Sequence, residues 1–151
     1  MILNQFVEIG NGFYNLKAPF FGSGFINKGT HMSLLRLRNG RFIVLDTCAL
    51  TAGAKAELDI LTVNGTLIDA VIATHPFHTT YFESFYEMYP TLNYYGTPRH
   101  IRLLKKIEWK GDVNMELIRT LWEPEVTSVL ILTPCCSLFS FCTFLCYCIL
   151  S

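Results

Sequence analysis

The segment from Ile72 to Thr80 has the sequence IATHPFHTT, and it lies where an apolar run ends. Residues 67–73 form that run, which predicts a buried strand leading directly into Thr74-His75. His78 follows three residues later, inside the same turn. A metal site at a strand end needs several imidazoles or carboxylates on one short, stiff turn. The segment therefore indicates a strand–turn–helix unit with His75 and His78 as candidate metal ligands.

The residues before this segment predict a β-hairpin and a helix. Asn39-Gly40 separates two apolar runs, residues 31–37 and 42–46. Asn-Gly between such runs is the strongest short hairpin signal, because both residues tolerate a positive φ. Residues 52–62 carry good helix formers, and Gly65 follows as a stop signal.

The residues after the segment continue the alternation of helix and strand. Thr79 or Thr80 is placed to cap a helix over residues 81–89. A short strand over 93–95 and a helix over 98–106 follow. Strands alternating with helices predict a layered α/β fold, with parallel pairing across the helical crossovers.

The order of these elements resembles the metallo-β-lactamase superfamily over roughly residues 6–110. Residues 44–47, with the sequence VLDT, look like the "ID-T-G" signature of that family, and residues 70–75 look like the strand that leads into its T-H-x-H-x-D-H motif. The resemblance implies half of an αββα sandwich of layered sheet and helices, zinc-dependent hydrolysis, and a role for Asp46 in holding the metal turn.

The chain departs from the family motif at most ligand positions. His75 occupies the first ligand position, whereas Phe77, Thr79 and Thr80 stand where the family has histidine, aspartate and histidine. His78 is one residue out of step, which gives H-x-x-H in place of H-x-H.

The ligands that the family takes from its C-terminal half are missing as well. None of the four histidines follows residue 100, and Asp112 is the only aspartate after Asp69. We therefore expect a degenerate member without hydrolase activity, and we assign no catalytic and no cofactor-binding residue. The alternative is a mononuclear zinc-dependent hydrolase that uses His75 and His78.

Other residues could complete a zinc set or supply a nucleophile. Asp46, His31 or His100 could provide a further ligand, although each lone histidine more often lies at the surface or is hydrogen-bonded in the core. Cys48 lies beside Asp46 and Thr47 without an identifiable general base, so we expect a small buried thiol.

The bulk composition limits the class of protein. The length of 151 residues fits one domain, and a formal net charge of +0 gives no reason to expect nucleic-acid binding. Charged residues make up 16%, below the roughly 25% of an average soluble protein. Residues 1–6 lack a basic region, so we expect no cleavable signal peptide, a cytoplasmic body and free thiols.

Apolar residues are concentrated at the C-terminus of the chain. Residues 126–151 contain no charged residue and every cysteine except Cys48, so we divide the chain into a metallo-β-lactamase-like half, 1–125, and a hydrophobic tail, 126–151. Residues 129–150 are long enough to form a transmembrane helix across a bilayer core of about 30 Å. The alternatives are a truncation product whose tail collapses onto the exposed sheet, and a homodimer that completes the sandwich.

Overall fold

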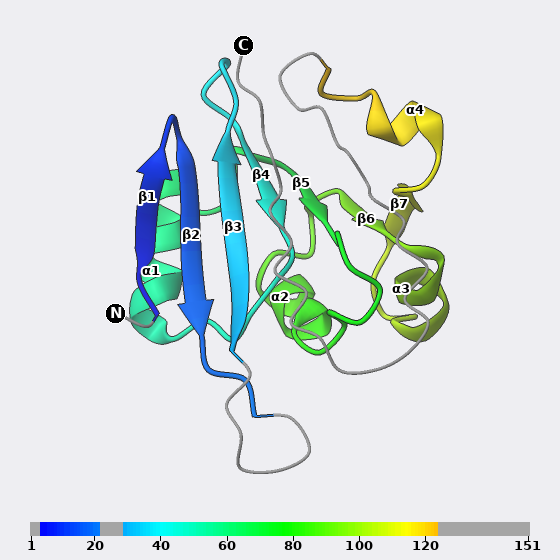
Figure 1. The fold of residues 1–151 in the computed structure, drawn as a ribbon, viewed down its shortest axis with the longest axis horizontal. Coiled ribbons are helices and arrows are strands. Elements are labelled where there is room, and N and C mark those ends of the chain that lie inside the picture. Colours follow the sequence, from blue (N-terminus) through cyan, green and yellow to red (C-terminus); the bar gives the residue numbers. More distant parts are fainter. Residues whose placement is uncertain (1–3, 22–28, 124–151) are drawn as a thin grey trace.

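The computed structural model of the protein describes residues 4–21 and 29–123. These residues form a seven-stranded sheet with helices packed on it (Figure 1). In chain order the elements are β1 (Phe6–Gly10), β2 (Phe13–Ala18), β3 (Thr30–Arg36), β4 (Phe42–Leu45), α1 (Ala52–Thr62), β5 (Ile68–Ile72), α2 (Phe82–Met88), β6 (Tyr94–Gly96), α3 (Pro98–Leu103), β7 (Trp109–Asp112) and α4 (Glu116–Arg119). The predicted α/β class is confirmed.

The strands lie in the sheet in the same order as in the chain, from β1 to β7. The first four are antiparallel neighbours, and β4 to β7 are parallel neighbours. Hairpins suffice for the antiparallel part, whereas each parallel pair needs a crossover. Helices α1, α2 and α3 supply these crossovers, as the alternating sequence pattern predicted.

Two local predictions are confirmed in detail. The turn between β3 and β4 contains Gly40 at φ +81, and Leu37 N donates to Arg41 O at 2.8 Å across its base. Helix α1 has the predicted bounds and begins at the N-cap Thr51, whose hydroxyl accepts from Ala54 N. An N-cap oxygen satisfies one of the backbone donors that a helix start leaves without a partner.

Two predictions about helix ends were wrong. Neither Thr79 nor Thr80 caps α2, because Tyr81 occupies the N-cap position and makes no side-chain cap. Thr79 and Thr80 lie two and one positions before the N-cap, too early for their hydroxyls to cap the first turn. Helix α3 ends at Leu103 and not at residue 106, since Leu104 leaves the helical conformation with φ −100 and ψ 72.

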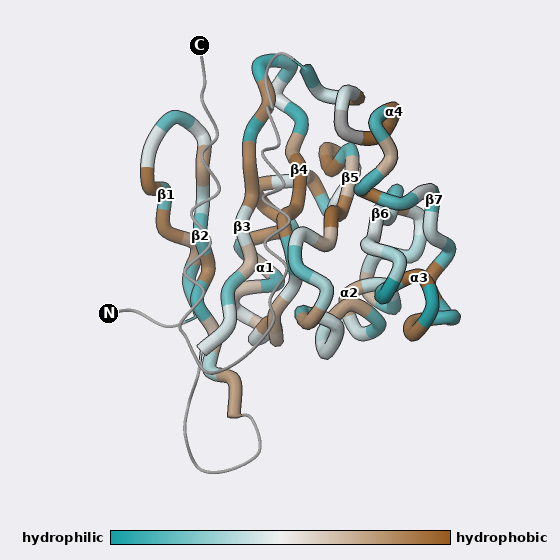
Figure 2. The backbone as a smooth tube through the Cα atoms, turned by 45° about the vertical axis from the view of Figure 1, so that its right-hand side comes forward, coloured by the Kyte–Doolittle hydropathy of each residue, from teal (hydrophilic) through white to brown (hydrophobic). Residues whose placement is uncertain are grey.

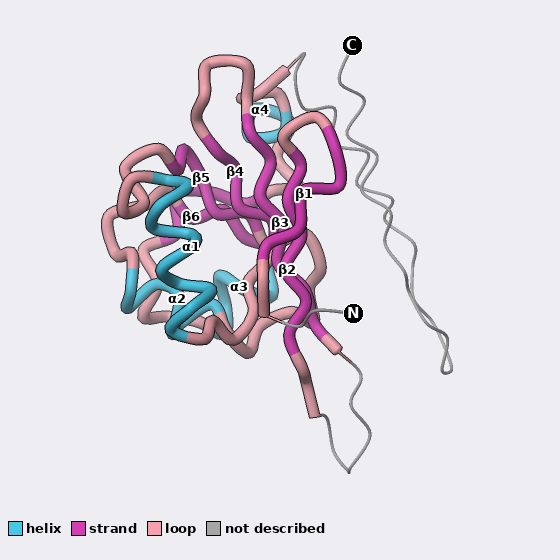
Figure 3. Tube along the Cα trace, turned by 90° about the vertical axis from the view of Figure 1, so that its left-hand side faces the viewer, coloured by secondary structure: helices cyan, strands magenta, loops and turns pink. Residues whose placement is uncertain are grey.

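The main core lies between the sheet and helices α1, α2 and α3, which cover one face (Figure 3). It gathers fully buried side chains from both layers, among them Leu16, Met32, Leu34, Val44, Leu58, Phe82, Phe85 and Tyr94. Burying one side chain of this size stabilises a fold by about 1.5–3 kcal/mol. The core thus fixes the sheet and the crossover helices as one unit.

The opposite face of the sheet is also apolar, and we call it the second sheet face. It is formed by Leu35, Leu37, Ile43 and Leu45, with Phe13, Ile72 and Trp122 packed against them. Successive residues of a strand point to opposite faces, so Ile43 lies on this face and Val44 in the main core. Figure 2 shows the resulting apolar colour along β3, β4 and β5.

The predicted features of the tail fall outside the described residues. These are the boundary at residue 125, the hydrophobic tail 126–151 and the transmembrane helix over 129–150. None of the helices within residues 4–21 and 29–123 is both long enough and apolar enough to cross a membrane. The homodimer concerns a second chain and stays a prediction.

Candidate functional site

The loop after β5 is joined to the end of β4 by Asp46. Strands β4 and β5 are parallel neighbours, so Asp46 and Thr74 leave the sheet at the same edge, and Asp46 N donates to Ile72 O at 2.8 Å. The Asp46 carboxylate is buried; its Oδ1 accepts from Thr74 N at 2.9 Å, and its Oδ2 accepts from the Thr74 hydroxyl. Asp46 itself has a left-handed backbone, with φ +55. This pair sets the direction in which the chain enters His75.

The far end of the same loop is held by His100 on α3. His100 is fully buried, and its Nε2 lies 3.2 Å from His78 O while its Nδ1 lies 2.8 Å from the Thr97 hydroxyl. A carbonyl oxygen can only accept, so Nε2 carries the hydrogen and donates, and Nδ1 accepts from Thr97. Burial lowers the pKa of His100, which agrees with this neutral form.

Three imidazoles come together between these two anchors. The ring centroids of His75 and His78 lie 5.2 Å apart, and those of His31 and His78 lie 6.1 Å apart. His31 belongs to β3, so it reaches the loop from another part of the sheet. The Nδ1 atom of His78 lies 3.5 Å from Asp46 Oδ2 and, among the described residues, this buried nitrogen has no hydrogen-bond partner.

The surroundings shift the pKa values of the three imidazoles in different directions. Burial lowers the pKa of His31 and the pKa of His75, because it penalises the charged ring. The Asp46 carboxylate raises the pKa of His78, because it stabilises the protonated ring. When a proton enters the cluster, His78 is therefore the ring that takes it, as the ion-pair partner of Asp46.

The donor set fits a metal only in part. Two imidazoles on one tetrahedral zinc hold their centroids about 5 Å apart, which matches His75 with His78 but not His31 with His78. Within the described part of the chain, no group of three or more histidine, cysteine, aspartate or glutamate residues is arranged to hold a metal ion. Asp46 and His100, the other candidates at this edge, are engaged in the hydrogen bonds of the loop.

The residues at the remaining motif positions offer no ligands. Phe77 is 62% exposed, and the Arg99 guanidinium carbon lies 5.1 Å from the centroid of its ring. Thr79 is half-buried and Thr80 is exposed. Cys48 is the small buried thiol that the sequence predicted, and burial raises its pKa to about 12, so it remains protonated at neutral pH.

Sequence reasoning missed the role of Thr97, and it named His31 only as one of several possible further ligands. Pro98 at the first helical position makes Thr97 the N-cap of α3, and His100 follows three residues later. In a capping box the side chain three residues after the N-cap folds back toward the N-cap residue, so this spacing was a usable signal that the two residues lie close together. The approach of His31 depends on the pairing of distant strands, and the sequence contains no local signal for it.

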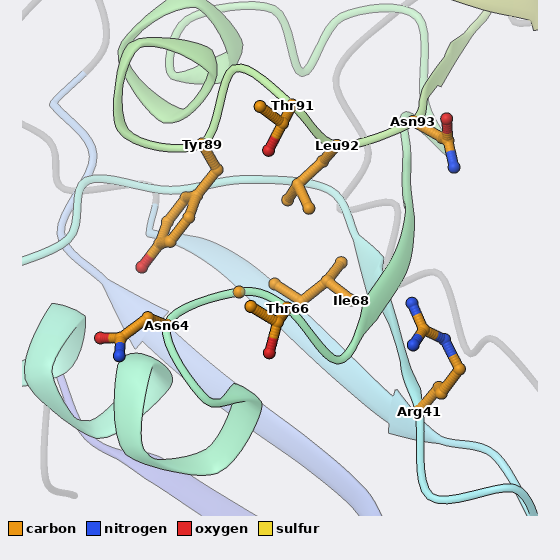
Figure 4. A pocket seen from close by; sticks show the side chains of 9 residues that line it. Arg41, Asn64, Thr66, Ile68, Tyr89, Thr91, Leu92 and Asn93 are labelled. Atoms are coloured by element: carbon orange, nitrogen blue, oxygen red, sulfur yellow. The ribbon is translucent and has the colours of Figure 1, made fainter.

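A separate cavity lies at the opposite edge of the sheet. It has a volume of about 270 Å³ and is lined by residues that precede β4, β5 and β6, among them Arg41, Thr66, Tyr89 and Asn93 (Figure 4). Arg41 in this lining is paired with Asp69, and neither His75 nor His78 reaches the cavity. The cavity and the histidine loop are therefore distinct sites.

Comparison with known proteins identifies the fold. No protein-family model and no curated protein matches the sequence. Among solved structures, the metallo-β-lactamase from Hirschia baltica matches with 18% identity and a TM-score of 0.53 over 76% of this chain and 53% of the other. The metallo-β-lactamase DIM-1 matches with 16% identity and a TM-score of 0.56 over 74% and 52%, and IND-7 with 18% and 0.52 over 76% and 55%.

The match extends over most of this chain but only part of the other proteins. The chain spans about half the length of the solved structures that it matches. Identities this low carry information about architecture and not about chemistry. The chain therefore has a divergent metallo-β-lactamase-like fold, as the order of its motifs predicted.

Proposed function

We propose that this protein is a non-hydrolytic form of the metallo-β-lactamase-like fold, in which the loop after β5 is a structural junction. One observation carries the proposal: both oxygens of Asp46 and the Nε2 atom of His100 hold this loop, while Nδ1 of His100 is engaged by the Thr97 hydroxyl of α3. These bonds tie β4, β5 and α3 together at one edge of the sheet. The loop thereby joins elements that are distant in sequence.

The remaining donors are too few for the chemistry of the matched proteins. A catalytic zinc takes three protein ligands and leaves one position for water. Here His75 and His78 are the histidines of the loop, and Phe77 and Thr79 replace further donors. The carboxylate nearest to His78 is that of Asp46, which already accepts two hydrogen bonds from Thr74.

A combined metal and activity measurement on the full chain tests the proposal. The protein is dialysed against zinc and then against metal-free buffer, its zinc content is measured, and hydrolysis of a β-lactam such as ceftazidime is followed. We expect zinc well below one equivalent and a rate equal to that of His75→Ala. One equivalent of zinc, with hydrolysis that His75→Ala and His78→Ala both abolish, would contradict the proposal.

The second candidate function is that of a mononuclear zinc-dependent hydrolase. The 5.2 Å separation of the His75 and His78 rings favours it, as does the ion-pair position of His78 Nδ1 beside Asp46. A carboxylate on one ring nitrogen leaves the other nitrogen for a metal. His75 and His78 would hold the zinc, which when bound supplies a Lewis acid and an activated water.

Substitutions of His31 distinguish further between the two candidate functions. Burial lowers the pKa of His31, which favours neutral imidazole, the form that binds metals. If the second function holds and the His31 ring moves to supply a third ligand, His31→Ala weakens zinc binding together with activity. If the loop is a structural junction, His31→Ala and His31→Gln behave alike, and neither changes zinc content.

A further inference from the structure

We propose that the second sheet face is covered by the tail of the same chain, residues 126–151. The face carries Leu35, Leu37, Ile43 and Leu45, whereas helices α1, α2 and α3 pack on the other side of the sheet (Figure 3). Beyond this cluster the same side of the sheet carries the polar pair Asn15 and Ser33 and then a further apolar residue. Val7, which pairs with Asn15 across β1 and β2, points to this side and is 52% exposed.

The chain leaves the described region on this face. Trp122 packs against the cluster, and its ring meets that of Tyr95 at 5.7 Å in an edge-to-face arrangement. Glu123 is the last described residue, so the tail starts within reach of the face. A segment tethered at the site that it covers has an effective concentration in the millimolar range, which a second copy does not have.

The length and chemistry of the tail suit the face. Seven strands about 4.8 Å apart make a sheet about 30 Å wide. A fully extended chain as long as residues 126–151 would reach about 80 Å, enough to cross that width twice. The tail has no charged residue and is rich in β-branched and aromatic residues. Burying it on an apolar face removes both surfaces from water without desolvating a charge.

The distribution of cysteines provides a reporter for each face. Cys48 lies in the main core, whereas every other cysteine lies in the tail. Native alkylation of the full chain, read by peptide mass spectrometry, therefore follows the two layers separately. We expect the tail thiols to react at least about 100-fold more slowly than in denaturant, because a packed segment opens rarely.

A matched pair of variants distinguishes the two faces. Ile43 and Val44 are neighbours on β4, both fully buried, and they point to the second sheet face and to the main core respectively. We expect Ile43→Ala to raise alkylation of the tail thiols about tenfold with little change at Cys48, since weakened packing opens the affected layer first. Val44→Ala should act mainly on Cys48. If both variants accelerate both reporters equally, the layers are not separate and the proposal fails.

Vesicle and concentration series decide between the tail and other occupants. The proposal requires a monomer that stays in solution without detergent and does not float with phosphatidylcholine–phosphatidylserine vesicles. If the chain floats with the vesicles and its tail thiols are protected from alkylation only when vesicles are present, the tail is a membrane anchor. If dilution dissociates a dimer and the protection of the tail thiols is lost at the same time, a second copy of the chain covers the face. Each of these results, like precipitation of the chain or unprotected tail thiols, would overturn the proposal.

Discussion

Asp46 should be the carboxylate whose replacement by a neutral residue destabilises the protein most, among the Asp and Glu residues that the structure describes. The Asp46 carboxylate is buried and accepts two hydrogen bonds, from Thr74 N and from the Thr74 hydroxyl. A hydrogen bond to a charged group contributes about 1.5–3 kcal/mol to stability. Asp46→Asn keeps the shape and one acceptor but loses the charge and the second acceptor, so we expect a loss of about 2 kcal/mol.

Asp46→Ala should cost about 4 kcal/mol. It removes both acceptors and leaves Thr74 without its partners, and alanine also tolerates the φ of +55 less well than asparagine. Asp69→Asn is the matched control, because Asp69 pairs with Arg41 where both side chains are partly exposed. Such a pair contributes about 0–1 kcal/mol.

The assay is urea unfolding of the full chain at neutral pH, followed by far-ultraviolet circular dichroism. A loss of stability appears as a lower midpoint with an unchanged slope. The reasoning is refuted if Asp46→Asn lies within about 0.5 kcal/mol of the wild type, or if Asp69→Asn loses as much. In either case the carboxylate would not be holding the loop.

The remaining predictions concern packing and pH. A Cβ on Gly96 would lie 2.7 Å from a Trp109 ring atom, so Gly96→Ala should cost about 1–3 kcal/mol. The control is Gly53→Ala in helix α1, where a Cβ would meet only the Thr51 hydroxyl oxygen at 4.0 Å, so this change should stabilise the protein by about 0.5–1 kcal/mol. Equal midpoints for the two variants in thermal unfolding would count against the packing described. Burial lowers the pKa of His100 below the 6.5 of the unfolded chain, so its contribution to stability is intact above pH 6.5 and is lost as the pH falls below that value. The raised pKa of His78 acts in the opposite direction, with a contribution present below pH 6.5 and lost at higher pH. The unfolding midpoint of the wild type should fall as the pH is lowered from 7.5 to 5, and His100→Gln should make this fall smaller. A fall of the same size in the variant would contradict a buried neutral His100.

The parts of the fold that follow local rules could be predicted from the sequence. Asn39-Gly40 specified its hairpin because few residues adopt a positive φ easily. Helix α1 followed from residues with high helix propensity before the stop signal Gly65, whereas its N-cap Thr51 was not predicted. The parallel order of β4 to β6 followed from the alternation of strand and helix.

The later elements could not be predicted in the same way. Strand β7 has the sequence WKGD, which shows no apolar alternation, and its pairing with β6 is set by the packing of Trp109 in the core. Helix α4 has only four residues, too few to show a helical period.

Only part of the histidine cluster could be predicted from the sequence. His75 and His78 lie on one turn, so their proximity followed from spacing. His31 joins them through the register of the sheet, and His100 reaches the loop from α3. Which atoms of Asp46 and His100 remain available for a metal depends on their hydrogen bonds, and these form only when distant elements pack.

A zinc titration followed by long-range histidine ¹⁵N nuclear magnetic resonance tests the structural role of the loop most directly. The spectrum reports the protonation and metal contacts of each imidazole separately. We predict that His100 remains neutral with its hydrogen on Nε2, and that one equivalent of zinc leaves His75 and His78 unshifted. Joint saturable shifts of His75 and His78 at one equivalent would contradict a non-hydrolytic junction and establish a metal centre at this loop.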